Sequence, residues 1–210
     1  MITLQRTLAL ALVLLLAAIG AVLLSNGQSG SAQPDRVGSS EFDGPTLAPG
    51  LRAANFSLLD QNGRRISLAR YRGRVVVLTF IHSLCRGACP LMVQQIKGAL
   101  NDLPGSWRQI PAIGVSVDPA QDTRANRIKF LRKYQMTRRL EYVGGSRAEL
   151  APLWRAYAIQ PLIGEGKADD HSAYVFLIDK RGMERVGFPV SALTPEALAH
   201  DIRVLARQRD

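Results

Sequence analysis

Three short runs of mostly apolar residues place the strongest constraint on how this chain can fold. They are RVVVLTF (74–80), IPAIGVSV (110–117) and AYVFLID (173–179). Strands that are apolar along nearly their whole length are typical of a sheet covered on both faces, because neither side of such a strand is left for water. The segments between them have helical spacing, so strands and helices alternate along the chain. This order predicts an α/β fold with a central mixed sheet and helices on both faces.

The remaining elements narrow the architecture further. Asn62-Gly63 is a strong turn signal and predicts an N-terminal β-hairpin from strands at 55–60 and 64–68. Ser146 followed by Glu149 is a capping-box pattern, and Thr194-Pro195 is a typical helix start. The further expected elements are helices at 89–100, 121–134 and 146–157, strands at 141–143 and 183–188, and a last helix from 194. A parallel core that ends in an antiparallel hairpin and a helix is the thioredoxin-like arrangement.

The N-terminal segment predicts where the chain resides. Residues 7–24 form 18 consecutive uncharged and nearly all apolar positions, which reaches the length that a membrane-spanning helix needs. We therefore expect a cytoplasmic N-terminus at 1–6, a transmembrane anchor at 7–25, a flexible tether at 26–52 and a folded domain at 53–208. A cleaved signal peptide, with a small-x-small site at 30–32, is the alternative. Arg6 before the apolar run orients the domain to the exported, periplasmic side of the cytoplasmic (inner) membrane.

Composition excludes several classes of function. The formal charge is +10, but an exported domain has no nucleic acid to bind, so we expect no nucleic-acid partner. The basic residues, such as Arg124, Arg127 and Lys133 on one predicted helix, are expected to form a solvated surface. The chain has two cysteines, too few for a disulfide-dense scaffold or for a four-cysteine zinc or iron–sulfur site.

Both cysteines lie in the loop that follows the first buried strand. The sequence there is FIHSLCRGACP (80–90), with Cys85 and Cys89 four residues apart. Ligands bind outside the carboxyl ends of strands in α/β sheets, and the N-terminus of the following helix stabilises a thiolate. Two thiols in this position can form a disulfide, take part in thiol–disulfide exchange, or hold a soft metal ion, Cu(I) above all.

A third metal ligand has a candidate late in the chain. His171 directly precedes the strand at 173–179, whose start is expected to adjoin the cysteine loop in a thioredoxin-like fold. His82 is nearer to the cysteines in sequence, and we expect it to pack, with hydrogen bonding to the site as the alternative. Asp118 is expected to end a strand, Asp122 to cap the next helix, and His200 to be solvated.

Three segments together resemble the Sco/SenC family of membrane-tethered, thioredoxin-like copper proteins. They are FIHSLCRGACPLM (80–92), VSVDPAQDT (115–123) and DDHSAYVFLID (169–179). The resemblance implies that Cys85, Cys89 and His171 bind copper, as Cu(I) or Cu(II). It also implies a role in maturing the binuclear copper site of cytochrome c oxidase. Arg86-Gly87 departs from the Pro-Asp or Thr-Thr of many relatives, which changes the charge of the loop.

Two functions follow from these residues. The first is a metallochaperone that delivers copper to the oxidase subunit, or to another periplasmic copper protein, or prepares the thiols of that site. The alternative is a membrane-tethered thiol–disulfide oxidoreductase, with Cys85 attacking and Cys89 resolving. Apart from such reductase activity, we do not expect an enzyme of the usual kind.

Overall fold

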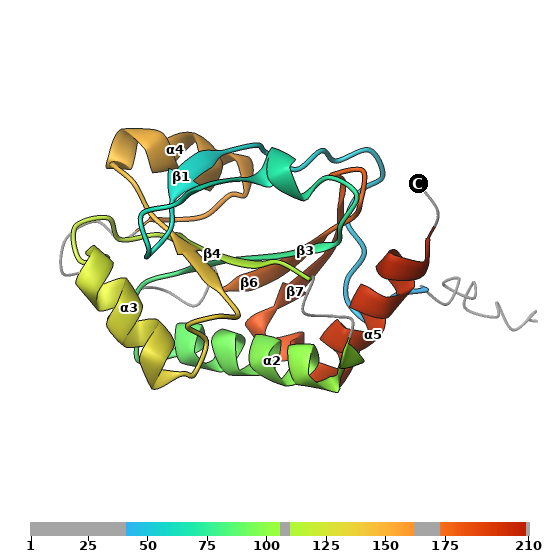
Figure 1. Ribbon diagram of the computed structural model, residues 1–210. Coiled ribbons are helices and arrows are strands. Elements are labelled where there is room, and N and C mark those ends of the chain that lie inside the picture. The colour runs from blue at the N-terminus through green and yellow to red at the C-terminus, as the bar shows by residue number, and fades with distance from the viewer. Residues whose placement is uncertain (1–40, 106–109, 162–172, 209–210) are drawn as a thin grey trace, which may run out of the picture. The chain divides into compact units, whose positions relative to one another are not determined.

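A five-stranded mixed sheet organises the protein (Figure 1). The computed structural model describes residues 41–105, 110–161 and 173–208. The strand order is β5-β4-β3-β6-β7, in which β3 pairs parallel with β4 and antiparallel with β6. The strands are β3 (Val76–Ile81), β4 (Ala112–Ser116), β5 (Glu141–Val143), β6 (Tyr174–Ile178) and β7 (Glu184–Pro189).

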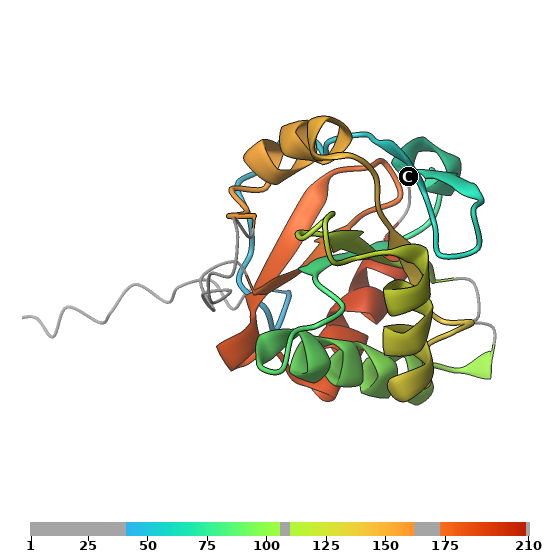
Figure 2. The same ribbon diagram turned by 90° about the vertical axis from the view of Figure 1, so that its left-hand side faces the viewer.

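Helices and a hairpin cover the two faces of this sheet (Figures 1 and 2). One face carries the helices α2 (Ala88–Asp102), α3 (Arg124–Lys133) and α5 (Pro195–Arg207). The other carries α4 (Arg147–Ala156), the hairpin β1 (Ser57–Leu59) and β2 (Arg65–Ser67), and the short helix η1 (Leu68–Tyr71). A further short helix, η4 (Val190–Ala192), precedes α5. All six residues of β3 are buried, because both faces are covered.

The sequence prediction of an α/β, thioredoxin-like fold is confirmed. The predicted hairpin turn and two predicted helix caps are confirmed as well. The hairpin β1–β2 forms antiparallel, and Gly63 adopts the φ of +80° that its turn requires. The Ser146–Glu149 capping box opens α4, and the Thr194 hydroxyl accepts from the Ala197 N–H at the start of α5. Short-range chemistry therefore sets these boundaries.

Two expectations about α3 are wrong. Thr123, not Asp122, caps the helix, since its hydroxyl accepts from the Asn126 N–H at 3.2 Å. Arg127 is not on a solvated face: it is only 8% exposed, and its guanidinium donates to the carbonyls of Leu59 at 3.0 Å and Tyr142 at 2.7 Å. The buried Tyr142 carbonyl needs a donor, which the long cation on the helix supplies, whereas the Leu59 carbonyl also accepts from the Gly144 N–H at 3.0 Å.

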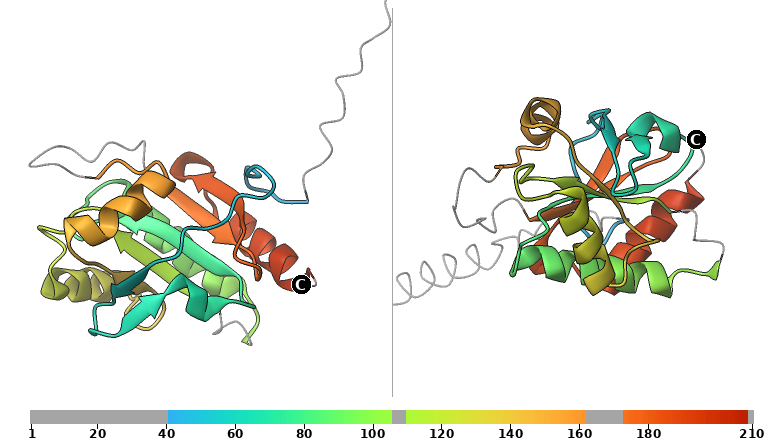
Figure 3. Two further views of the ribbon diagram at one scale, coloured as in Figure 1. Left: turned by 90° about the horizontal axis from the view of Figure 1, so that it is seen from above. Right: turned by 60° about the vertical axis from the view of Figure 1, so that its left-hand side comes forward.

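The segment before residue 53 also makes ordered contacts (Figure 3, left). Phe42 is buried in the core on the α2 and α5 face. Thr46 and Arg52 form bridges to Val186 and Met183, beside β7. Contacts of the domain thus begin within the stretch that the sequence assigned to the end of the tether.

The predicted membrane anchor at 7–25 lies outside the described residues and stays a prediction. Within residues 41–105, 110–161 and 173–208, no helix combines the length and the apolar character that a membrane crossing requires.

Candidate metal centre

The cysteine loop connects the central strand β3 to helix α2 and faces the viewer in Figure 2. β3 ends at Ile81, and α2 begins at Ala88. Because β3 and β4 are parallel, the loop lies at the carboxyl edge of both strands. This is the edge at which α/β proteins bind their ligands.

A buried carboxylate fixes the start of the loop. Asp122, 5% exposed, accepts from the Ser83 N–H at 2.6 Å and from the Ser116 hydroxyl at 2.5 Å. Asp122 thus joins the loop to the end of β4 instead of capping α3. The Tyr142 hydroxyl adds a second anchor by donating to the Ile81 carbonyl at 3.2 Å. Asp118, expected to end the strand, accepts from the Gln121 N–H at 3.3 Å.

The two thiols have different environments. Cys85 is half-buried, Cys89 is buried in the first turn of α2, and both are free thiols. The Cys89 N–H donates to the Cys85 sulfur at 3.3 Å. Gly87 at the helix start has no side chain to cap it, so this sulfur takes one of the unpaired N–H groups there.

These contacts separate the acidities of the two thiols. The Cys89 thiol, the His82 ring and the N–H groups of Cys89 and Gly87 donate to Cys85, and they lower the pKa of Cys85 to about 4 against the burial of the sulfur. The hydrogen bond to Cys85 and burial raise the pKa of Cys89 far above its usual range. Cys85 is therefore the thiolate and Cys89 the protonated thiol in the reduced protein.

His82 belongs to the same cluster, whereas the sequence favoured a packing role for it. A ring nitrogen of His82 and the sulfurs of Cys85 and Cys89 all lie within 4.8 Å of one another. Burial of the ring opposes its protonation, but the hydrogen bond to Cys85 and the charges of Cys85, Asp122 and Asp118 raise the pKa of His82 overall. The alternative of hydrogen bonding to the site is thus the one that the geometry supports. The sequence signal for this role was the position of His82, three residues before Cys85 in a turn that a hydrogen bond from the Cys85 N–H to the His82 carbonyl closes.

The third predicted ligand, His171, lies outside the described residues. Its neighbour Ala173 is buried in the core that also contains Cys89. Thr79 of β3 pairs with Val175 of β6, and the two strands run antiparallel. The start of β6, with Ala173 before it, therefore lies at the end of the sheet where β3 ends and the cysteine loop begins.

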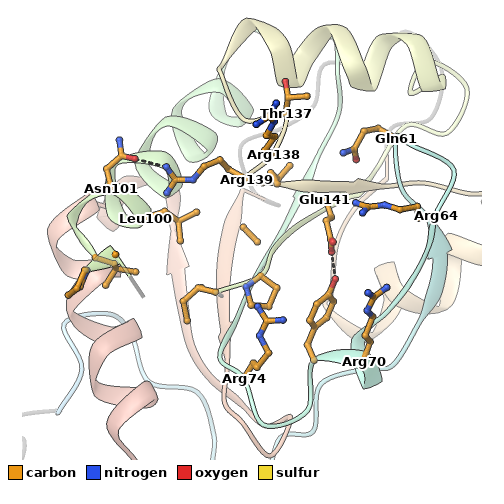
Figure 4. Close-up of a pocket in the computed structure, with 18 residues that line it drawn as sticks. Gln61, Arg64, Arg70, Arg74, Leu100, Asn101, Thr137, Arg138, Arg139 and Glu141 are labelled. Atoms are coloured by element: carbon orange, nitrogen blue, oxygen red, sulfur yellow. Dashed lines mark hydrogen bonds between the residues drawn. The ribbon is translucent and has the colours of Figure 1, made fainter. Parts of the chain in front are cut away.

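Two other features of the described chain lie apart from the cysteines. His200, expected to be solvated, is half exposed, and its Nδ1 lies 2.9 Å from Asp201 and 3.4 Å from Asp43. A pocket of about 720 Å³ opens where β3, β4 and β5 begin, at the opposite edge of the sheet (Figure 4). Its described lining contains several arginines and no cysteine or histidine, so it offers no soft donors for a metal ion.

Comparisons with known proteins show which family the chain belongs to. The bovine (Bos taurus) protein SCO2 homolog, mitochondrial, is 28% identical over 137 residues, covering 61% of this chain and 50% of that protein. The chain thus spans about half the length of that relative.

Solved structures match over more of their own length. The copper-bound structure of ScoI from Bradyrhizobium japonicum is 27% identical, with a TM-score of 0.62 over 73% of this chain and 99% of that one. BsSco, described as a member of the Sco family of cytochrome c oxidase assembly proteins, is 20% identical, with a TM-score of 0.65 over 76% and 95%, and supports the fold alone. The model of the SCO1/SenC family matches residues 46–207. The chain belongs to the SCO1/SenC family.

Proposed function

We propose that this chain is a copper-binding metallochaperone whose metal site consists of Cys85, Cys89 and His171. In this role it delivers copper to the binuclear copper site of cytochrome c oxidase, or prepares the thiols of that site. The observation that carries the proposal is the pairing of a thiolate and a buried thiol at the carboxyl edge of the sheet, with their sulfurs within 4.8 Å.

The donor set fits copper better than other common metals. Cu(I) prefers soft thiolate ligands and accepts two or three of them, whereas structural zinc sites normally have four protein ligands. Only Cys85 already carries the charge that a metal bond needs, so binding must release the proton of Cys89. Copper therefore competes with one proton at this site. The copper-bound ScoI structure, 27% identical to this chain, supports the same choice of metal.

The register of β3 and β6 supports His171 as the third ligand. Antiparallel pairing brings the start of β6 to the end of β3 where the cysteine loop starts. His171 precedes the buried Ala173 by two positions, and two residues of chain reach at most about 7 Å.

Two exposed apolar side chains support a protein as the copper acceptor. Leu84 is 53% exposed and directly precedes Cys85, and Leu91 in the first turns of α2 is 45% exposed. Apolar side chains around a reactive group supply contact area for a docking protein. The resemblance to the Sco/SenC family implies the oxidase subunit as that protein, and the predicted anchor would hold the domain beside it at the periplasmic face of the inner membrane.

Metal analysis of the reduced chain tests the proposal. The full chain, offered one equivalent of Cu(I) under reducing conditions, is expected to retain one copper ion. His171→Ala should weaken copper binding by about tenfold or more while leaving disulfide exchange unchanged, and His200→Ala should change neither. Loss of all copper from the wild-type chain would refute copper delivery, and unchanged affinity in His171→Ala would refute the assigned third ligand.

The different acidities of the two thiols also favour thiol–disulfide exchange as a second candidate function. The Cys85 thiolate would attack a partner disulfide, release one partner thiol and form a mixed disulfide. Cys89 would then lose its proton and displace the second partner thiol, leaving a Cys85–Cys89 disulfide that an external thiol reductant must reopen. Reduction of an oxidised oxidase copper domain, followed by thiol counting, tests this step. An unchanged rate in Cys85→Ser would refute it.

A further inference from the structure

His82 lies in a position where it can contact a metal ion as well as the sulfurs. The turn that ends β3 closes through a hydrogen bond from the Cys85 N–H to the His82 carbonyl at 3.2 Å. The next residue, Ser83, is held by Asp122 at 2.6 Å. The backbone that places the imidazole beside the cysteines is therefore held at the His82 carbonyl and at the residue that follows it.

The spacing of the three side chains suits one ion. One ligand atom each of His82, Cys85 and Cys89 already lie within 4.8 Å of one another. Bonds of about 2.3 Å to sulfur and about 2.0 Å to nitrogen place the ligands of one ion about 3.5 to 4 Å apart. Side-chain rotations close such a difference without moving the backbone.

Part of the His82 ring has no use within the described protein. Its Nδ1 atom is buried and has no hydrogen-bond partner among the residues that the structure describes. An imidazole nitrogen without a partner costs free energy when it is buried, so it calls for a partner such as a bound ion or an ordered water. Packing alone gives no reason to place a nitrogen heterocycle here, since an aromatic hydrocarbon ring would fill the space.

We infer that His82 is a nitrogen donor to Cu(I), so that the cysteine loop by itself supplies a complete two-sulfur, one-nitrogen site. The inference rests on the proposed function and deepens it. With three donors in residues 82–89, the copper ion stays bound when His171 is replaced or has dissociated from it. The acceptor can then replace one ligand at a time, and copper remains Cu(I) throughout the exchange.

Copper binding by single and double histidine variants tests this role. The experiment titrates the reduced full chain with Cu(I) against a chromophoric Cu(I) chelator and counts sulfur and nitrogen neighbours by X-ray absorption. His82→Phe keeps a ring of similar size and removes the donors, and His200→Ala is the matched control. We expect His82→Phe to lower Cu(I) affinity about 10- to 100-fold. His171→Ala should retain two sulfurs and one nitrogen, and the His82→Phe/His171→Ala double variant should show two sulfurs and no histidine nitrogen.

The outcomes separate this inference from the proposed function. If wild-type protein binds no copper, the proposed function fails. If wild-type protein binds copper while His82→Phe has the same affinity and the same count of neighbours, the role of His82 is wrong and copper binding stands. A His171→Ala protein that shows no histidine nitrogen would also overturn the inference. Circular dichroism of His82→Phe confirms that any loss of copper is not loss of fold.

Discussion

Asp122 offers the sharpest test of how the fold positions the cysteine loop. Its buried carboxylate accepts from the Ser83 N–H at 2.6 Å and from the Ser116 hydroxyl at 2.5 Å. Asp122→Ala removes both acceptors and leaves two donors without partners. Hydrogen bonds to a charged group contribute about 1.5 to 3 kcal/mol each, and relief of the buried charge offsets part of that loss. We therefore expect Asp122→Ala to lower the free energy of unfolding by about 3 kcal/mol.

Urea unfolding and thermal melting measure this change. For a domain of this size, 1 kcal/mol shifts Tm by about 2 to 4 °C, so Asp122→Ala should melt about 6 to 12 °C lower. Asp122→Asn keeps one acceptor oxygen and should lose about half as much. Hydrogen exchange should become faster at the amides of Ser83 and Cys85, because the anchor of the loop is gone.

Asp118→Ala is the matched control. The Asp118 carboxylate accepts a 3.3 Å bond within an exposed turn, so its removal should cost less than about 0.5 kcal/mol. If Asp122→Ala is as stable as Asp118→Ala and exchanges its loop amides no faster than wild type, Asp122 does not hold the loop.

Three further predictions follow from the charges of the folded chain. Because the pKa of Cys85 is lowered to about 4, alkylation of Cys85 in the reduced chain should keep its rate from pH 8 down to about pH 5, as followed by peptide mass spectrometry; a rate that falls tenfold per pH unit below 8 would contradict this. Burial raises the pKa of Glu184 to about 7, so its protonated form stabilises the fold at pH 4 and this stability is lost as pH rises through 7; Glu184→Gln should be more stable than wild type by about 1 to 3 kcal/mol at pH 9 and equal at pH 4 in urea unfolding. Arg127→Met should cost about 1 to 3 kcal/mol, because the buried Tyr142 carbonyl loses its donor while the Leu59 carbonyl keeps its bond from the Gly144 N–H; Lys133→Met on the exposed face should cost almost nothing, and equal melting temperatures would refute the buried role of Arg127.

Signals that act over a few residues were readable from the sequence. The apolar runs predicted β3, β4 and β6, and Ser146 and Thr194 predicted the starts of α4 and α5. In these places the residues nearest in sequence decide the structure, through periodic burial or a hydrogen bond within one turn.

Interactions between distant residues were not readable. Arg127 has the type and spacing of a surface residue, and only the carbonyls of Leu59 and Tyr142 explain its burial. Asp122 precedes a helix as a cap would, but its partner Ser83 lies 39 positions away. His82 was expected to pack, and its position within 4.8 Å of both sulfurs depends on the shape of the loop, which the residue order does not specify.

Copper binding by cysteine variants tests the central claim most directly. The claim is that Cys85 and Cys89 together hold one copper ion at the carboxyl edge of β3. The reduced full chain and its Cys85→Ser/Cys89→Ser variant would each receive one equivalent of Cu(I) and be passed through a desalting column before metal analysis. We predict one copper per wild-type chain and none on the variant. Equal copper on both proteins, or none on either, would contradict the account.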